Sequence, residues 1–412
     1  MLEGGFYLLL VLYNITLLKA NYNPPAGGFE LSYLPYEKEV CGIINTGILR
    51  VFSVLQAPPN YFCTHFAMTN LVLTKIFSLT SLSFLVALVS TPLLTHFLYK
   101  YKLGKNIRDS KDTPLFTQMH AAKKGTPTMG GFLVWGITAL LVVLFWVLDR
   151  VLGLEAFHNL NILSRKETLL PLAAFVGAAV VGMADDLLDI NRMGHNGRGM
   201  RFRFKVFLYA LVAMVGAWWF YFKLGFDAIH IPFGGTLTLG WLFIPFFIFV
   251  VIATSFAVNQ TDGLDGLAGG TLLIAFFAFG LIAYVRGQEN LAALIGIVAG
   301  SLLAFLWFNV YPARFFMGDT GSMGLGVLLA IVAFLTNSIL LLPVIGLVFV
   351  IEAVTTVLQL FWKKVFKRKL FLSAPVHHHF EALGWPETKV TMRAWILASV
   401  CALVGSIMYF LG

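Results

Sequence analysis

Acidic side chains in this sequence gather in three short stretches, each of which borders a long apolar run. Asp185 and Asp186 end one run, the segment Asn259–Asp265 follows a second, and Asp319 lies between glycines ahead of a third. Carboxylate oxygens are hard ligands, and Mg²⁺ typically takes one or two of them and completes its shell with phosphate oxygens and water. The three stretches together therefore indicate a site that handles phosphate groups with a magnesium ion.

The spacing of these acids indicates which of them can face the same ligand. If the second stretch is helical, Asn259, Asp262 and Asp265 recur every third residue and lie on one side. Neighbouring side chains on a helix diverge by about 100°, so Asp185 and Asp186 cannot bind one ion identically. We expect one of the pair to face a metal ion and the other to face a second substrate.

Two further stretches carry cationic, hydroxyl or imidazole groups. The segment Lys123–Gly131 has a Gly/Thr backbone and lysines that suit a phosphate, although lysines beside a membrane span are also common for topological reasons. The adjacent His377, His378 and His379 cannot share one helix face, so a zinc site built from all three is not expected. They can instead donate hydrogen bonds to phosphate or carboxylate. Phe316, beside Asp319, could stack on a nucleobase or simply lie at the membrane interface.

The composition places these groups in a membrane protein. Of 412 residues, 58% are hydrophobic and 12% charged, about half the charged fraction usual for soluble domains. Apolar runs of about 20 residues recur, and each can cross a bilayer core of roughly 30 Å. The net charge of +9 reflects cytoplasmic loops rich in Lys and Arg, so nucleic-acid binding is not expected. The three cysteines have no metal-binding spacing; Cys41 and Cys63 could pair outside the cell, but two free thiols are the simpler reading.

The apolar runs predict an all-α integral membrane protein with about ten transmembrane helices. Loops 100–124, 187–205 and 362–393 are the most basic, so we expect them in the cytoplasm, with both ends of the helical core outside. The acids then lie at the cytoplasmic ends of the third, fifth and seventh spans. The predicted spans are 76–99, 130–149, 168–184, 204–222, 239–258, 268–285, 291–310, 322–336, 339–361 and 393–411.

The first 75 residues are expected to form a separate extension ahead of the transmembrane domain at 76–412. Residues 6–18 are apolar but too short to span, which favours a helix lying in the interface. Residues 20–62 contain several prolines and glycines, which predict a loop-rich segment on the outer side.

Taken together, the five stretches resemble the phospho-N-acetylmuramoyl-pentapeptide transferase family, within the superfamily of polyprenyl-phosphate N-acetylhexosamine-1-phosphate transferases. The matching segments are KKGTPTMGG at 123–131, ADD at 184–186, NQTDGLDGLA at 259–268, FMGDTGS at 316–322 and APVHHHFEALGWPETKV at 374–390. The resemblance implies ten spans, Mg²⁺ and a cytoplasmic active site in the bacterial inner membrane. It also implies transfer of phospho-MurNAc-pentapeptide from its UDP carrier to undecaprenyl phosphate, which yields lipid I and UMP for peptidoglycan synthesis, by a homodimer embedded in membrane lipids.

The resemblance also implies roles for individual residues. Asp185, Asp186 and Asp319 would be the catalytic acids, with Asp319 the direct magnesium ligand and His378 in the catalytic pocket. The residues implied to bind substrate are Lys123, Thr128, Lys205, Asn259, Asp262, Asp265, Asn309, Phe316, His377 and His379. The chain departs from the family pattern at Asp189, where a lysine is usual, and at Phe256 and Gln260. The first departure removes one expected phosphate contact.

Two other readings and two mechanisms stay open at this point. A related transferase acting on UDP-GlcNAc would use the same acids, but the segment His377–His379 argues against it. A transporter would carry its carboxylates near mid-span, where only Glu352 is found. The lipid phosphate could attack directly, or an Asp could first form an acyl phosphate. The direct route is favoured because a phosphate monoester, with a second pKa of about 6, is already a nucleophile at neutral pH.

Overall fold

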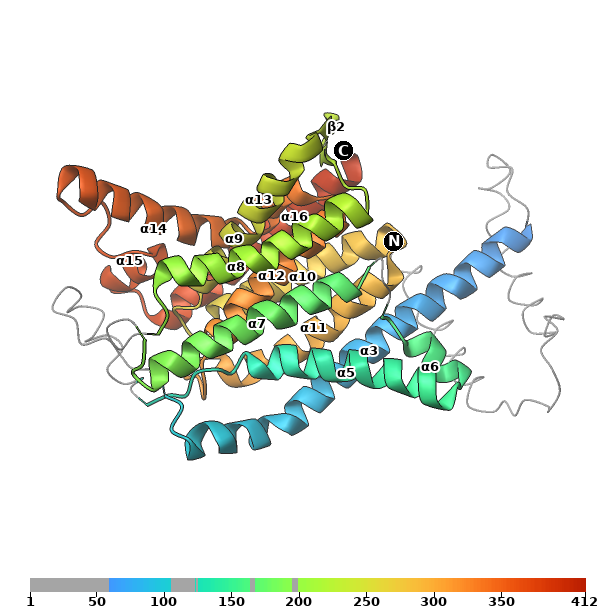
Figure 1. The fold of residues 1–412 in the computed structure, drawn as a ribbon, viewed down its shortest axis with the longest axis horizontal. Helices are drawn as coiled ribbons and strands as arrows, with labels where there is room; N and C mark the ends of the chain where they lie inside the picture. The colour runs from blue at the N-terminus through green and yellow to red at the C-terminus, as the bar shows by residue number, and fades with distance from the viewer. Residues whose placement is uncertain (1–58, 105–122, 124, 164–166, 195–198) are drawn as a thin grey trace, which may run out of the picture. The chain divides into compact units, whose positions relative to one another are not determined.

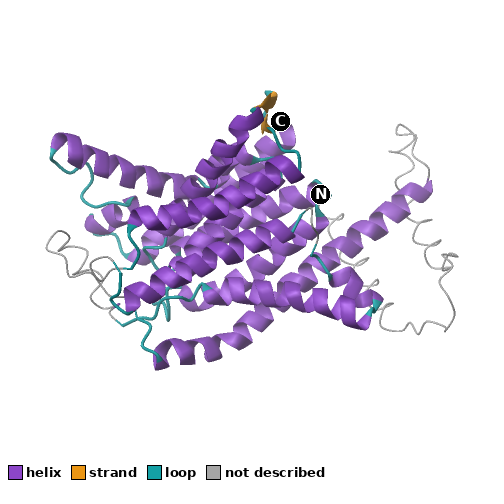
Figure 2. Ribbon diagram, viewed as in Figure 1, coloured by secondary structure: helices purple, strands orange, loops and turns teal. Residues whose placement is uncertain are grey.

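The computed structural model describes residues 59–104, 123, 125–163, 167–194 and 199–412. Within them the regular secondary structure is helical apart from one short hairpin, which confirms the expected all-α membrane fold (Figure 2). The interfacial helix expected at 6–18 lies outside the described residues, as does most of the outer loop expected at 20–62. From residue 59 to 62 that loop is instead the start of helix α3.

The helices follow the order of the apolar runs (Figure 1). In chain order the α-helices are α3 (Pro59–Lys100), α5 (Phe132–Leu152), α6 (Glu155–Leu160), α7 (Leu169–Ile190), α8 (Phe202–Trp218), α9 (Phe243–Thr261), α10 (Leu267–Val285), α11 (Glu289–Asn309), α12 (Asp319–Leu335), α13 (Leu342–Ile345), α14 (Leu347–Phe366), α15 (Val376–Ala382) and α16 (Glu387–Leu411). Three short elements extend them: η3 (Trp219–Lys223), η4 (Gly240–Leu242) and η5 (Ile339–Leu341). Strands β1 (Ala228–Ile231) and β2 (Gly235–Thr238) form an antiparallel hairpin.

Eight helices in the described part of the chain are long and apolar enough to cross a membrane, and one bent pair makes a possible ninth. The eighth predicted span corresponds to α12, which has only 17 residues and is about 26 Å long. This helix is the centre of the bundle: every residue from Thr320 to Leu335 is buried, and it packs chiefly against α7 and α9. A helix surrounded by protein can be apolar on all sides, and its first residue, Asp319, is thereby fixed at one end of the core.

The ninth predicted span, 339–361, is broken in the structure. Elements η5 and α13 end at Gly346, and α14 leaves at an angle of 81°. Gly346 has φ −96° and ψ 28°, outside the helical range, and Pro343 lies in the first turn of the short α13. The break carries Glu352, on α14, to the segment that contains the three histidines.

Helix α11 and helix α3 approach closely at a glycine. A Cβ placed on Gly300 would lie 2.2 Å from the carbonyl oxygen of Thr80 and 3.0 Å from the amide nitrogen of Phe84. Helices in membranes associate largely through such small residues, because van der Waals packing replaces the hydrophobic effect there. Gly300 therefore sets the distance between α3 and the rest of the bundle.

We predict that Gly300→Ala lowers the free energy of unfolding of the detergent-solubilised protein by about 1–3 kcal/mol, because the backbones of α3 and α11 must move apart. The change is measured as a lower melting temperature. Gly177→Ala on α7 is the matched control, since a Cβ there meets no atom within 4 Å. Alanine favours a helix by about 1 kcal/mol over glycine, so the control should be neutral or stabilising. Equal melting temperatures for the two variants would contradict the close approach.

Candidate active site

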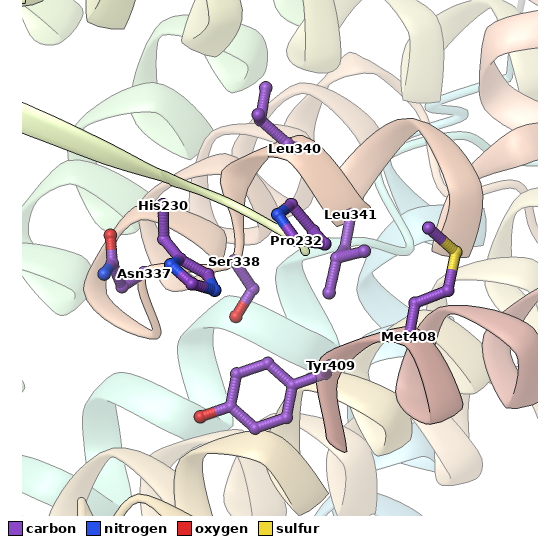
Figure 3. A pocket seen from close by; sticks show the side chains of 8 residues that line it. All are labelled: His230, Pro232, Asn337, Ser338, Leu340, Leu341, Met408 and Tyr409. Atoms are coloured by element: carbon purple, nitrogen blue, oxygen red, sulfur yellow. The ribbon is translucent and has the colours of Figure 1, made fainter. Parts of the chain in front are cut away.

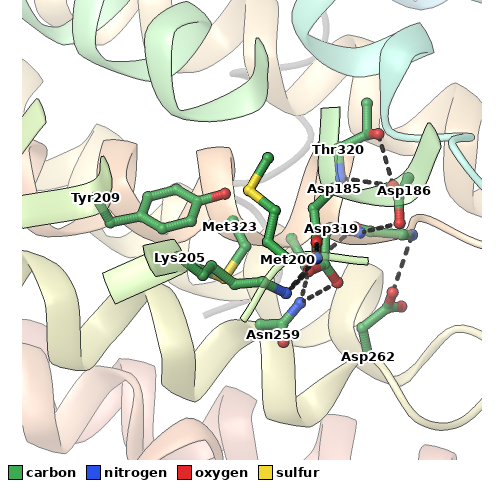
Figure 4. A network of polar contacts seen from close by, with 12 residues as sticks. Asp185, Asp186, Met200, Lys205, Tyr209, Asn259, Asp262, Asp319, Thr320 and Met323 are labelled. Atoms are coloured by element: carbon green, nitrogen blue, oxygen red, sulfur yellow. Dashed lines mark hydrogen bonds and ion pairs between the residues drawn. The ribbon is translucent and has the colours of Figure 1, made fainter. Parts of the chain in front are cut away.

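A lysine joins two acids that are far apart in the sequence (Figure 4). Lys205, near the start of α8, places its Nζ 2.5 Å from Oδ2 of Asp319 and also forms an ion pair with Oδ2 of Asp185, near the end of α7. The three side chains are 10–17% exposed. One ammonium group is thus shared by two carboxylates in poorly hydrated surroundings, where charge interactions are stronger than in water.

The remaining oxygens of these two acids are also held. The Met200 amide donates to Oδ1 of Asp185 at 2.6 Å. Asn259, at the end of α9, donates from Nδ2 to Oδ1 of Asp319 at 2.8 Å and to Oγ of Ser322 at 2.9 Å. Each carboxylate therefore has a fixed orientation, which is what a preorganised site requires.

Asp186 points away from Asp185 and accepts hydrogen bonds from the first backbone amides of α12. Its Oδ2 accepts hydrogen bonds from the amide of Thr320 at 2.9 Å and from that residue's hydroxyl at 2.6 Å. The amide of Asp319 lies 3.3 Å from its Oδ1. A carboxylate at a helix N-terminus satisfies amides that have no partner within the helix. The divergence expected for the Asp pair is therefore present, with Asp186 positioning Asp319.

Glycines allow this arrangement. A Cβ on Gly182 of α7 would lie 2.2 Å from the carbonyl oxygen of Asp319, so only glycine lets α7 pass the start of α12. Gly318, with φ +72°, donates its amide to Oδ2 of Asp262 at 3.1 Å. A Cβ on Gly318 would lie 2.6 Å from both Oδ2 of Asp186 and Oγ1 of Thr128, so Thr128 borders the same cluster.

A second cluster forms around Lys123. Its Nζ lies 2.7 Å from Oδ1 of Asp265 and 2.5 Å from Oε1 of Glu387, and 5.7 Å from the centre of the Phe316 ring. Asp265 also accepts from the Ala313 amide through Oδ2 at 3.0 Å. The structure therefore groups Lys123 with Asp265 and Phe316, and groups Lys205 with Asp185 and Asp319.

Asn309 ties together the two loops that border this second cluster. Its Oδ1 accepts from the Gly266 amide at 3.0 Å, and its Nδ2 donates to the Phe315 carbonyl at 2.9 Å. The side chain is 3% exposed. Both ends of the amide are used within the protein, so Asn309 fixes the spacing between these two loops.

The three histidines have different surroundings. His377 is buried and its Nδ1 lies 2.9 Å from Oε2 of Glu352. Its Nε2 has no hydrogen-bond partner among the described residues and faces Gly263, where a Cβ would lie 2.2 Å away. His378 Nδ1 lies 2.7 Å from Oε2 of Glu381. His379 Nδ1 accepts from the Leu372 amide at 3.2 Å, on the exposed side of the segment.

Three glutamates were not selected from the sequence as site residues, although each holds one that was. Glu352 pairs with His377, Glu381 with His378, and Glu387 with Lys123. One signal was available: Glu352 is the single acid inside an apolar run, and such groups are usually paired or functional. Glu381 and Glu387 lie inside the matching segment at 374–390, but their partners depend on the fold.

A small hollow lies elsewhere, at the end of the bundle where α12 finishes (Figure 3). Its lining includes His230 of β1, Asn337 and Ser338 ahead of η5, and Tyr409 of α16. None of its lining residues is an acid or a lysine. It is therefore separate from the two charged clusters.

The contact between His377 and Gly263 gives a testable consequence. Gly263→Ala should push the imidazole away from the Asp262 loop, because the new Cβ would overlap the ring. We expect at least a tenfold loss of the transferase activity that the sequence resemblance implies, and a change of about 1–3 kcal/mol in the free energy of unfolding. Activity would be followed by nucleotide release and stability by thermal unfolding. Full activity in this variant would show that the ring position does not matter.

The comparison with known proteins agrees with the geometry. Residues 168–337 match the model of "Glycosyl transferase family 4", a range that holds Asp185, Lys205 and Asp319. Phospho-N-acetylmuramoyl-pentapeptide-transferases from Chloroflexus aggregans and from Clostridium perfringens strain 13 are each 38% identical to this chain. The alignments cover 79% and 80% of this chain and 87% and 97% of those proteins. The enzyme of the same name from Geobacillus kaustophilus is 36% identical, over 79% of this chain and 95% of its own length. The chain belongs to the phospho-N-acetylmuramoyl-pentapeptide-transferase family.

Proposed function

We propose that this protein transfers phospho-MurNAc-pentapeptide from UDP-MurNAc-pentapeptide to undecaprenyl phosphate, forming lipid I and UMP in peptidoglycan synthesis. The observation that carries the proposal is the Lys205 bridge between Asp185 and Asp319 at the end of apolar helices. A nucleotide in water and a phosphate on a lipid can meet only where solvent borders the hydrocarbon region. The names of the relatives support the same reaction.

In this proposal an oxygen of the lipid phosphate attacks the β-phosphorus of the UDP-linked substrate directly. A new phosphoanhydride bond forms as the bond to the UMP oxygen breaks, and UMP leaves. Both reactants are anionic, so the main task of the site is to neutralise and align them. Lys205 supplies positive charge, and Asp185 orients the attacking phosphate or takes its remaining proton. Asp319 positions Lys205, because its Oδ2 accepts from that amine.

Magnesium fits the chemistry of these donors. In the part of the chain that the structure describes, no three acids, histidines or cysteines converge on one point. Two carboxylates, Asp185 and Asp319, do converge on one cation, the Lys205 ammonium. Mg²⁺ commonly takes one or two carboxylates and leaves the other positions to phosphate and water. Asp319 would hold the ion with help from Asp185, and the ion would supply charge neutralisation of the diphosphate.

The Lys123 cluster is the proposed nucleotide half of the site. Its cation, the Phe316 ring and the carboxylate of Asp265 are the kinds of group that contact phosphate, base and ribose. Asp262, Asn259 and Thr128 lie at the edge of the Lys205 cluster, through Gly318 and Asp319. We place the segment His377–His379 beside them for the sugar and peptide, because His377 faces Gly263, next to Asp262. This face is proposed to be cytoplasmic, in a bacterial inner membrane, and the active protein to be a homodimer.

We predict that purified protein with undecaprenyl phosphate and Mg²⁺ releases UMP from UDP-MurNAc-pentapeptide and not from UDP-GlcNAc. Chelation with EDTA should stop the release, and Mg²⁺ should restore it. Turnover of UDP-GlcNAc alone would support transfer of a phosphosugar but refute UDP-MurNAc-pentapeptide as the substrate.

Removing the lysine bridge should slow the reaction strongly. Lys205→Gln and Asp319→Asn are each expected to lower kcat by about 10²–10³-fold, as removal of a preorganised charge-stabilising group generally does. Asp149→Asn is the control, because Asp149 pairs with Asn161 and His158 away from both clusters. A Lys205→Gln enzyme within tenfold of wild type would contradict the proposed role.

A further inference from the structure

Glu387 connects three segments that are distant in the sequence. It is the first residue of α16, and its Oε1 accepts a hydrogen bond from Nζ of Lys123 at 2.5 Å and from the amide of Asp265 at 2.6 Å. Its side chain is 10% exposed and that of Asp265 only 2%. The oxygen therefore fixes both the lysine and the backbone of the loop between α9 and α10.

The charges in this cluster do not balance. Lys123 carries one positive charge and lies within 2.7 Å of two carboxylates, those of Asp265 and Glu387. Lys389 and Arg393 of α16 lie over the Trp385 ring, at 4.6 Å and 4.5 Å from its centre. In the ionised state the three described groups, Lys123, Asp265 and Glu387, carry one negative charge in excess, which opposes the approach of an anionic ligand.

We propose that Glu387 is a positioning residue that holds and neutralises Lys123 in the empty site and releases it to the phosphate of an incoming nucleotide. This inference rests on the proposed function, which places the nucleotide beside Lys123. Because Glu387 attracts the lysine and repels the nucleotide, it sets the affinity for the nucleotide without taking part in the chemistry. It also makes the release of UMP easier, since the lysine has a carboxylate to return to.

The test compares two substitutions in the full-length, detergent-solubilised protein. Glu387→Gln removes the charge and keeps an oxygen that can accept from the Asp265 amide. Glu387→Asp keeps the charge. Binding of UMP, measured by calorimetry, should be about three- to tenfold tighter in the Gln variant and unchanged within twofold in the Asp variant. The gain should shrink at high salt, because partly exposed charges are screened.

The reactivity of Lys123 gives a second readout that needs no nucleotide. An amine held by one carboxylate in place of two should be acylated faster by an N-hydroxysuccinimide ester, by about two- to fivefold, with the modified peptide quantified by mass spectrometry. Glu289→Gln is the matched control for charge, because Glu289 begins α11 at the end opposite Asn309. It should change neither readout.

The outcomes separate the two proposals. Weaker or unchanged UMP binding together with unchanged acylation in Glu387→Gln would overturn the role of Glu387. A tighter UMP complex in the Asp variant as well would also overturn it, because charge would then not be the cause. Faster acylation without any turnover of the muropeptide by wild type would support the Glu387–Lys123 contact and refute the proposed reaction. Should Glu387→Gln fail to fold, Glu387→Ser removes the same charge with a smaller side chain.

Discussion

The ion pair of Lys205 with Asp185 and Asp319 is the interaction on which the rest of the site depends. Asp185 and Asp319 come from α7 and α12, and two carboxylates this close would repel each other in surroundings with little water. One shared cation, the Lys205 ammonium, offsets that repulsion because it contacts both carboxylates. The ion pair therefore joins α7, α8 and α12. It also holds in place the charged groups that a transfer between two anionic phosphates requires. Breaking it by removing one partner would leave an uncompensated charge in a poorly hydrated place.

Helix α12 is built to present Asp319 to that lysine. The helix is buried along its length, and its first turn is held by Asp186 from α7, with Gly182 allowing the two backbones to touch. The first amides of a helix have no partners within the helix, and at a buried helix start they have no water either. The Asp186 carboxylate accepts from these amides and in doing so fixes the position of Asp319. The segment at 127–131 forms backbone hydrogen bonds with Phe316 and Met317, which hold Thr128 close to the start of α12.

The membrane class, most spans and the convergence of the acidic stretches were predictable from the sequence, because apolar length and charge at span ends are local properties. The positions of the partners were not. Glu352 meets His377 only because the ninth span breaks at Gly346, and neither propensity nor hydropathy reveals an 81° bend. Asp186 was expected to be a catalytic acid and Asn309 to bind substrate, and each bonds to backbone groups of a distant segment. Phe256, a departure from the family pattern, packs against Phe202 and Tyr209, a contact that only the fold defines.

The central claim is that the carboxylates orient and neutralise, and that the lipid phosphate itself attacks. Asp185 and Asp319 already share Lys205 and accept from Met200 and Asn259, which suits a fixed orienting group better than a free nucleophile. The most direct measurement is exchange of radiolabelled UMP into UDP-MurNAc-pentapeptide by the purified enzyme with Mg²⁺ and no lipid acceptor. Direct attack predicts no exchange above that of the Asp319→Asn variant. Exchange at a rate comparable to turnover would require a covalent phospho-enzyme and would contradict the account.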